Sequence, residues 1–292
     1  MTFTKMHGCG NDYIYVDCTR SDLPDASALA VKVSDRHFGI GGDGLILIKR
    51  GKKAEFEMEM YNADGSRGAM CGNGIRCVAK YVFDHNLFAD SVSKTEFTIE
   101  SMGAVKHIRI VSGKPGDKVC RARVDMGQPI LAAEKIPVQC SDGIGCDMPV
   151  IMKPLFVNDT EYKITCVSMG NPHAVVFLDK PPAQFPVCEI GPYFENNAFF
   201  PDRTNTEFAF VQDRRTIFMR VWERGSGETW ACGTGTCATV VAAILNGLVD
   251  AGEKITVHLL GGDLEIEWSG NKTDSVFMTG PAETVFNGDI EL

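Results

Sequence analysis

Residues 61–77, YNADGSRGAMCGNGIRC, are the most informative stretch of the sequence, because their pattern returns at residues 222–237, WERGSGETWACGTGTC. Each stretch passes through a glycine-rich turn to Cys-Gly-x-Gly and then enters an apolar segment typical of a helix. The two motif cysteines, Cys71 and Cys232, are 161 positions apart. The pattern therefore predicts two glycine-rich turns that each present a thiol at the start of a helix.

Other segments repeat in the same order, at offsets of 153 to 161 positions. The paired segments are 10–11 and 170–171 (Gly-Asn), 44 and 205 (each before an apolar strand), 56–61 and 217–222, and the strand ends 124–126 and 276–279, which precede Gly127 and Gly280. Several matches in one order indicate an internal duplication rather than chance similarity.

Each half alternates short strand patterns with turns and contains one long helix, which follows its Cys-Gly-x-Gly. This order differs from the βαβ alternation of a parallel sheet. We therefore expect an α+β fold with two pseudo-symmetric, β-rich, barrel-like domains, residues 1–120 and 121–280, each wrapped around its central helix. We expect the two thiol-bearing helix starts to face a cleft between the domains.

Composition narrows the class of protein. The chain has 292 residues, 44% of them hydrophobic, and a net charge of −9 without a basic run, which argues against a nucleic-acid or anionic-membrane partner. No apolar run approaches 18 residues, and the first residues, MTFTKMHGCG, lack the apolar core of a signal peptide. We expect a cytoplasmic protein.

Eleven cysteines could indicate disulfides or zinc. A disulfide framework is typical of small secreted chains, which this sequence does not resemble. No C-x2-C pair occurs, and no histidine pair has zinc-finger spacing. We expect no metal site, and most of the thiols should be small buried side chains.

A thiol at a glycine-rich helix start has a specific chemistry. The N–H groups and the positive dipole end of the helix can bind an anion, either a phosphate or a carboxylate. Neither copy carries the Lys-Ser/Thr of a P-loop. The same environment lowers the pKa of a cysteine, so we expect two reactive thiols beside an anion site.

Two such thiols together favour two-base chemistry. One thiolate can remove a proton from a carbon while the other thiol delivers a proton to the opposite face, which inverts the stereocentre. A single Cys-Gly-x-Gly could be merely a structural helix start, but packing alone gives no reason for two equivalent copies.

The motifs taken together resemble those of the diaminopimelate epimerase family. They are residues 7–12 (HGCGND), 70–76 (MCGNGIR), 170–173 (GNPH), 203–205 (RTN), 223–236 (ERGSGETWACGTGT) and 280–282 (GPA). The resemblance implies an epimerase that interconverts LL- and meso-diaminopimelate without pyridoxal phosphate or another cofactor, for lysine and peptidoglycan synthesis. It also implies a diaminopimelate epimerase-like fold, a homodimer, and a C-terminal segment, residues 281–292, that packs onto the first domain.

The resemblance assigns roles to individual residues. Cys71 is expected to be the proton donor and Cys232 the proton acceptor in the LL-to-meso direction. His173 and Glu223 are expected to modulate the thiol pKa values. The residues expected to bind substrate are Asn11, Asn62, Gly72, Asn73, Asn171, Asn205, Glu223, Arg224, Gly233 and Thr234.

Two positions depart from the family pattern. Gly44 stands where some members carry a substrate-binding glutamine, and Phe286 stands where the family often has a dimer-contact tyrosine. Two alternatives stay open on the sequence. One is a racemase of the proline racemase type, although residues 228–231 read Glu-Thr-Trp-Ala rather than Asp-Arg-Ser-Pro. The other is a non-catalytic amino-acid-binding protein.

Overall fold

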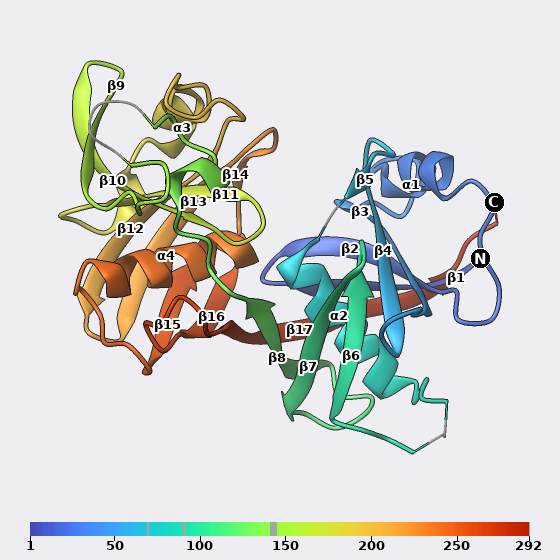
Figure 1. Ribbon diagram of the computed structural model, residues 1–292. Helices are drawn as coiled ribbons and strands as arrows, with labels where there is room; N and C mark the ends of the chain where they lie inside the picture. The colour runs from blue at the N-terminus through green and yellow to red at the C-terminus, as the bar shows by residue number, and fades with distance from the viewer. Residues whose placement is uncertain (69, 90–91, 141–144, 292) are drawn as a thin grey trace. The chain divides into compact units, whose positions relative to one another are not determined.

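The computed structural model describes residues 1–68, 70–89, 92–140 and 145–291. The chain forms two compact units, which are labelled by element in Figure 1. Unit 1 comprises Met1–Asp125 together with Thr279–Leu292, and unit 2 comprises Met126–Met278. The C-terminal segment therefore belongs to the same unit as the N-terminus.

Unit 1 is built mainly from strands. Its elements are β1 (Thr2–Gly8), β2 (Asn11–Asp17), α1 (Ala26–Ser34), β3 (Gly44–Arg50), β4 (Phe56–Asn62), β5 (Arg67–Gly68), α2 (Gly72–Asp84), β6 (Glu96–Ser101), β7 (Ala104–Ser112) and β8 (Val119–Gly127), which ends two residues into unit 2. β1 is antiparallel to β2, β2 is parallel to β3, and β3 is antiparallel to β4. β4 runs parallel to β6, β6 is antiparallel to β7, and β7 is antiparallel to β8.

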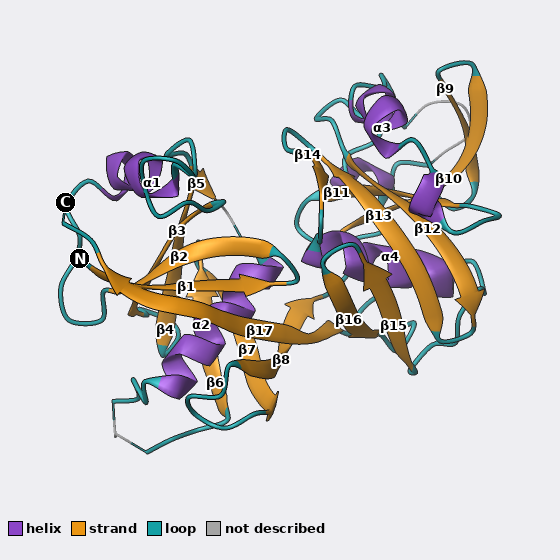
Figure 2. Cartoon of the chain, turned by 180° about the vertical axis from the view of Figure 1, so that it is seen from behind, coloured by secondary structure: helices purple, strands orange, loops and turns teal. Residues whose placement is uncertain are grey.

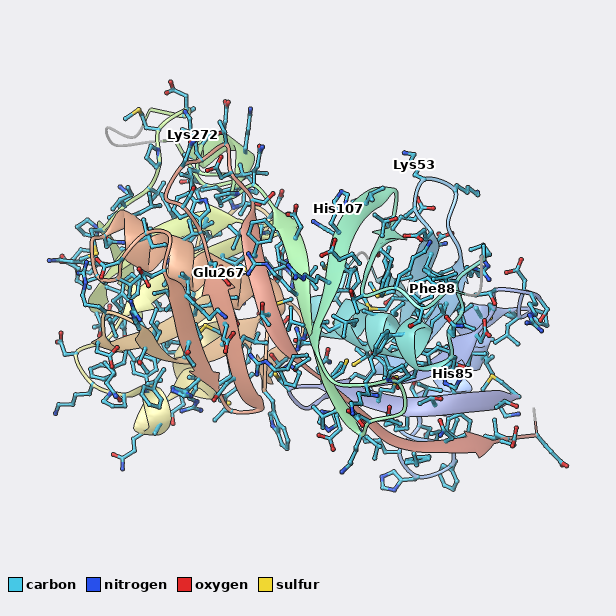
Figure 3. The ribbon with its side chains drawn as sticks, turned by 90° about the horizontal axis from the view of Figure 1, so that it is seen from below. Lys53, His85, Phe88, His107, Glu267 and Lys272 are labelled. Carbon is cyan, nitrogen blue, oxygen red and sulfur yellow. The ribbon has the colours of Figure 1, made fainter. Side chains whose placement is uncertain are left out.

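The last strand, β17 (Val276–Asp289), returns to unit 1 and pairs antiparallel with β1, placing Thr2 opposite Asp289. The strands lie around α2, which packs on β1, β2 and β7 (Figure 2). Beyond the end of α2, Phe88 packs edge-on against Phe56 and Phe97, with ring centroids 5.8 and 5.3 Å away; Figure 3 labels Phe88. This aromatic cluster closes the core at the helix end opposite Cys71.

Unit 2 repeats the arrangement. Its elements are η1 (Ala133–Lys135), β9 (Lys153–Val157), β10 (Thr160–Ser168), β11 (Pro172–Phe177), η2 (Pro182–Gln184), α3 (Val187–Glu195), β12 (Asn205–Asp213), β13 (Thr216–Glu223), β14 (Gly227–Thr229), α4 (Gly233–Leu245), β15 (Lys254–Leu259) and β16 (Gly262–Glu267). β10 is antiparallel to β11, β11 is parallel to β12, and β12 is antiparallel to β13. β13 runs parallel to β15, and α4 packs on β10, β11, β12 and β16.

The strand register confirms the duplication. Leu45 lies opposite Tyr61 between β3 and β4, and Thr206 lies opposite Trp222 between β12 and β13. Thr206 follows Leu45 by 161 positions and Trp222 follows Tyr61 by the same number, which is also the separation of the motif cysteines. α2 and α4 contain 13 residues each and begin one residue after their cysteine. The expected fold class, two β-rich units that each enclose a helix, is confirmed.

Helix α2 buries a cationic side chain next to the cysteine turn. Arg76 is fully buried, and its guanidinium donates to the carbonyl oxygens of Pro281, at 3.1 Å, and Gly72, at 3.0 Å. Buried polar groups need such partners, since an unpaired carbonyl away from water is costly. Arg76 therefore fixes β17 against the start of α2.

Among the described helices, none is long and apolar enough to cross a membrane.

Candidate active site

The first cysteine turn holds its thiol by two hydrogen bonds. Cys71 is the N-cap of α2, with extended backbone angles of φ −125° and ψ 113°. Its Sγ accepts the N–H of Gly74 at 3.2 Å and donates to Oδ1 of Asn11 at 3.1 Å. The expected neighbours Gly72 and Asn73 occupy the first two helical positions, where N–H groups have no intrahelical acceptor. Such a helix start is suited to binding an anion.

Glycine is required at position 74 for a steric reason. A Cβ atom there would lie 2.8 Å from Cδ1 of Ile46 and 3.3 Å from Cβ of Cys71. Real Cβ contacts are essentially never as short as the first of these distances. A larger residue would displace either the buried Ile46 side chain or the cysteine, so the motif glycine lets the cysteine cap the helix.

Asn62 and Gly44 lie opposite each other where β3 and β4 pair. Asn62 donates through Nδ2 to Oγ of Ser66 at 2.9 Å. At Gly44 a Cβ atom would collide with the carbonyl oxygen of Tyr61 and would lie 2.9 Å from the Tyr13 ring. As the backbone stands, the missing glutamine could not be replaced by any side chain at position 44.

The second cysteine turn has the same geometry. Cys232 is the N-cap of α4, with φ −117° and ψ 112°, and its Sγ accepts the N–H of Gly235 at 3.4 Å. Thr234 Oγ1 lies 3.5 Å from the same sulfur. Gly233 and Thr234 take the two helical positions that Gly72 and Asn73 hold in unit 1.

The surroundings of Cys232 differ from the expectation of an acidic thiol. Burial raises the pKa of Cys232 well above its ordinary value, and the negative charges of Glu223 and Glu207 raise it further. Hydrogen bonds from Thr234 and Gly235 act in the opposite direction but are outweighed. The predicted low pKa is therefore wrong for Cys232, because the helix start is buried beside two carboxylates.

Glu223 forms a hydrogen bond with Cys232. Burial raises the pKa of Glu223, while hydrogen bonds with Thr229 and Cys232 and the neighbouring His173 oppose that rise. Thr229 donates its hydroxyl to Oε1 of Glu223. Glu223 therefore places a carboxyl group with a raised pKa against the thiol.

His173 is fully buried and forms hydrogen bonds with Asn171 and Glu207, of which Glu207 was not predicted from the sequence. Its Nδ1 is 2.7 Å from Oε1 of Glu207, and its Nε2 is 3.0 Å from Oδ1 of Asn171. Glu207 is also fully buried, and a Cβ atom at Gly235 would collide with its carboxylate. The available signal for Glu207 was an acidic residue within the apolar strand 205–211, NTEFAFV.

The side chain of Asn205 forms a hydrogen bond with the backbone of Arg224. Asn205 donates through Nδ2 to the carbonyl of Pro172 at 2.7 Å and accepts the N–H of Arg224 at 2.9 Å. The guanidinium of Arg224 donates to the carbonyl of Asp202 at 2.8 Å. Unit 2 thus gathers Asn205 and Arg224 at the ends of adjacent strands.

The predicted site residues fall into two groups, one in each unit, which are named the first and the second half-site. Unit 1 contains Cys71, Asn11, Asn62, Gly72 and Asn73, whereas unit 2 contains Cys232, Asn171, His173, Asn205, Glu223, Arg224, Gly233 and Thr234. The structure connects Cys71 to Asn11 and surrounds Cys232 with carboxylates. Among the described residues, no group of three or more metal-ligating side chains could hold a metal ion.

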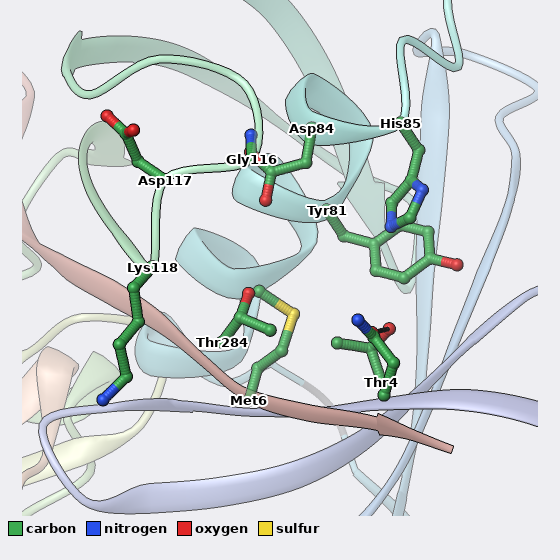
Figure 4. Close-up of a pocket in the computed structure, with 10 residues that line it drawn as sticks. Thr4, Met6, Tyr81, Asp84, His85, Gly116, Asp117, Lys118 and Thr284 are labelled. Atoms are coloured by element: carbon green, nitrogen blue, oxygen red, sulfur yellow. Dashed lines mark hydrogen bonds between the residues drawn. The ribbon is translucent and has the colours of Figure 1, made fainter. Parts of the chain in front are cut away.

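A cavity of about 270 Å³ lies at the other end of α2 (Figure 4). Tyr81, His85, Asp117 and Lys118 are among the residues that line it. Tyr81, the lining residue of α2 that is nearest to Cys71 in sequence, follows it by ten residues, which is about 15 Å along the helix at about 1.5 Å per residue. It is therefore separate from the first half-site.

Comparison with known proteins identifies the family of the chain. The sequence model of the family described as diaminopimelate epimerase matches residues 3–132 and 165–285, which include both cysteine turns. The chain belongs to the diaminopimelate epimerase family. It is therefore an isomerase, and the resemblance found in the motifs is confirmed.

Members of this family with similar sequences span the whole chain. The diaminopimelate epimerase of Agathobacter rectalis is 54% identical, and the alignment covers 100% of this chain and 100% of the relative. That of Acetivibrio thermocellus is 50% identical, over 100% of this chain and 99% of the relative. That of Leptospira biflexa is 47% identical, over 100% of this chain and 99% of the relative. Diaminopimelate epimerases from distant organisms thus align with both halves.

Solved structures with low sequence identity share the fold. A phenazine biosynthesis protein of the PhzF family from Bacillus anthracis matches with a TM-score of 0.67 and 14% identity, over 100% of this chain and 99% of that chain. A probable proline racemase from Agrobacterium radiobacter matches with a TM-score of 0.67 and 11% identity, over 100% and 93%. These two proteins therefore share the duplicated β-rich fold of this chain.

Proposed function

We propose that the chain interconverts LL- and meso-diaminopimelate by a two-base proton transfer between Cys71 and Cys232. The observation that carries the proposal is the repeated helix cap. In both units a cysteine with the same backbone angles accepts the N–H of the glycine three residues later. Family membership supplies the substrate, and the chemistry of the paired thiols supplies the mechanism.

In the LL-to-meso direction, Cys232 is the base. Glu223 takes the proton of the Cys232 thiol, which its raised pKa favours, and the thiolate then removes the α-hydrogen of the substrate. Cys71 delivers its Sγ proton to the opposite face of the same carbon. The protons balance, since Cys232 ends as a thiol, Cys71 as a thiolate and Glu223 as a protonated carboxyl group. In the reverse reaction Cys71 is the base and Cys232 the proton donor, and Glu223 then returns its proton to Cys232.

The helix starts stabilise the carbanionic transition state. Charge that develops on the carboxylate beside the reacting carbon is stabilised by the N–H groups of Gly72 and Asn73 in α2 and of Gly233 and Thr234 in α4. Asn11, Asn62, Asn171, Asn205 and Arg224 bind the rest of the substrate. Arg224 suits the distal carboxylate, because a guanidinium can donate two parallel hydrogen bonds. Neither the removal of the α-hydrogen nor the delivery of the new proton needs a cofactor.

The test follows deuterium from solvent into product. We expect the wild-type chain in heavy water, with a chelator and without added pyridoxal phosphate, to convert LL-diaminopimelate to meso-diaminopimelate that carries deuterium at the inverted carbon. Chiral chromatography with mass spectrometry measures both properties. L-Proline, the substrate of the alternative racemase, should acquire no deuterium. Deuteration of proline, or binding of diaminopimelate without any exchange, would contradict the proposal.

We also propose that the enzyme is a cytoplasmic homodimer, as the family resemblance implies. Val285 and Phe286 on β17 are 48% and 45% exposed, and the Phe286 ring packs edge-on against Phe3 at 5.9 Å. This apolar surface is suited to a partner subunit. Light scattering should give a mass near twice the 31.9 kDa of one chain, and Phe286→Asp should shift the mass towards that of the monomer. A wild-type monomer at micromolar concentration would refute the dimer.

A further inference from the structure

The Asn11 amide contacts the Cys71 thiol through its oxygen, and a neighbouring carboxylate determines that orientation. We propose that Asp43 is a positioning residue that holds the Asn11 amide with Oδ1 towards Cys71, so that Cys71 is kept as a thiol ready to donate its proton. This inference rests on the proposed function for the use of that proton. The orientation itself can be tested without substrate.

The two ends of an asparagine amide have nearly the same shape but opposite hydrogen-bonding roles. Which end faces the thiol is therefore decided by the partner of the other end. Nδ2 of Asn11 donates to Oδ2 of Asp43 at 2.7 Å, and Oδ1 of Asn11 accepts from Sγ of Cys71 at 3.1 Å. Since an ionised carboxylate only accepts hydrogen bonds, a flipped Asn11 would place its oxygen against another acceptor.

Asp43 is itself held firmly. Its Oδ2 also accepts the N–H of Asp12 at 3.0 Å, and its Oδ1 accepts from Arg36 at 3.0 Å. Its backbone N–H donates to the carbonyl of Asp12 at 2.7 Å, and its carbonyl accepts the N–H of Ala63 at 3.0 Å. Both carboxylate oxygens and both backbone groups are therefore fixed, so the acceptor facing Asn11 has little freedom to move.

The neighbouring charges allow two carboxylates to stand together. The Asp12 carboxylate lies 2.6 Å from Nζ of Lys5 and 2.9 Å from the Arg36 guanidinium, which also contacts Asp43. Two cations thus neutralise two adjacent carboxylates. Burial and the charge of Asp12 raise the pKa of Asp43, whereas the hydrogen bonds from the Asp12 N–H and from Asn11 and the charge of Arg36 favour its anionic form. The same contacts hold the Asp43 carboxylate as the acceptor that faces Asn11.

The second half-site has a different residue at the position equivalent to Asp43. The position equivalent to Asp43 is Thr204, whose hydroxyl donates to the carbonyl of Asn205 at 2.9 Å. The amide oxygen of Asn171 faces Nε2 of His173. Cys232 instead has carboxylates beside it, including Glu223, which can take its proton. The duplicated thiols therefore have different proton environments, which the shared motif does not reveal.

The consequence for Cys71 follows from hydrogen-bond polarity. An amide oxygen facing the sulfur stabilises the protonated thiol, whereas an NH2 group facing it would stabilise the thiolate. Without Asp43 the Asn11 amide can rotate and present Nδ2 when the thiolate forms. Loss of Asp43 should therefore increase the fraction of Cys71 that is thiolate at neutral pH.

The experiment compares iodoacetamide alkylation of Cys71 from pH 5 to 10 in the wild type, D43A and D43N, with peptide mapping by mass spectrometry. Asp43→Ala removes the acceptor. Asp43→Asn removes the same charge, but its amide oxygen can still accept from Asn11 and from the Asp12 N–H. We expect D43A to move the midpoint of the Cys71 profile to lower pH, giving about fivefold more thiolate at pH 7. D43N should stay near the wild type.

Two controls separate orientation from loosening of the turn. Greater exposure of Cys71 would raise the plateau rate at high pH, whereas a reoriented amide moves the midpoint. In an Asn11→Ala background, where no amide remains, D43A should cause no further shift of the midpoint. Cys232, in the other unit, should keep its profile in every variant.

The outcomes decide the proposal. An unmoved midpoint in D43A, an equal shift in D43N, or the same D43A shift in the Asn11→Ala background would each overturn it. These readouts need no turnover, so they stand even if the chain fails to epimerise diaminopimelate. If it does epimerise, kcat should fall about tenfold in D43A with little change in KM, because a misplaced donor affects the transition state more than binding.

Discussion

Replacing Cys71 or Cys232 by serine is expected to lower kcat for epimerisation at least about a thousandfold, because positioned acid–base groups contribute roughly that much. Serine is the informative substitution. Each sulfur accepts a helix-capping N–H from the glycine three residues on, and a serine hydroxyl is among the best helix caps. The helix start therefore survives, whereas the alcohol is far too weak an acid to replace the thiol. Chiral chromatography of the product measures the loss.

Matched controls lie in the same helices. Cys77→Ala and Cys237→Ala remove fully buried thiols from α2 and α4, and both variants should keep their rate of epimerisation. Position 77 tolerates the change for a visible reason, since its equivalent in the other half is Ala238. A serine variant at either motif cysteine that retains a tenth or more of the wild-type kcat would refute the two-base mechanism. Loss of activity in the controls would indicate damaged folding instead.

Replacing Glu223 by glutamine is expected to lower kcat about a hundredfold while raising the stability of the fold at neutral pH. The loss of rate follows because the amide cannot take the proton of Cys232. The gain in stability follows because burial raises the pKa of Glu223, so its ionised form is unfavourable in the folded state. The wild-type enzyme therefore carries an unfavourable charge that its mechanism uses.

The sign of the pH dependence distinguishes this carboxylate from a structural one. A carboxyl group with a raised pKa favours the fold below its ordinary pKa, and that contribution is lost as pH rises through the folded value. Glu228, in the following strand β14, has the opposite behaviour. Although burial raises its pKa, hydrogen bonds from Arg220 at 2.6 and 2.9 Å lower it overall. Its contribution is present above its ordinary pKa and is lost as pH falls through the folded value.

Thermal unfolding at pH 5 and pH 8 can measure both effects. Glu223→Gln should raise the melting temperature at pH 8 more than at pH 5, whereas Glu228→Gln should lower it at pH 8 and leave most of the activity. Destabilisation by Glu223→Gln at pH 8, or a rate of epimerisation near that of the wild type, would show that Glu223 is a structural residue.

Much of the fold and of the candidate site could be predicted from the sequence because the relevant features are local. Helix capping involves a cysteine and a glycine three residues apart, and strand pairing repeats with the alternation of side chains. Once the 161-position offset is recognised, one half predicts the other. Cys71 and Cys232 are found at equivalent helix starts, and the family that their motifs resemble is the one to which the chain belongs.

The glycines of the two turns show what the sequence motif could not predict, namely which side chains pack against each turn. Gly74 and Gly235 are equivalent in sequence, but a side chain at the first would meet Ile46 and one at the second would meet the Glu207 carboxylate. The two neighbours occupy equivalent strand positions with opposite chemistry. The sequence pattern predicts the space at each turn, whereas the structure shows what surrounds it.

The sequence by itself determined the duplication, the β-rich fold and the positions of the two thiols, since all three depend on short-range periodicity and capping. Only the tertiary structure decided the proton environment of each thiol. Glu207 is brought beside Cys232 from a strand 25 positions earlier, and Asp43 reaches Asn11 across 32 positions. Burial and charge act through space, so the pKa of Cys232 is raised although a helix start alone should lower it.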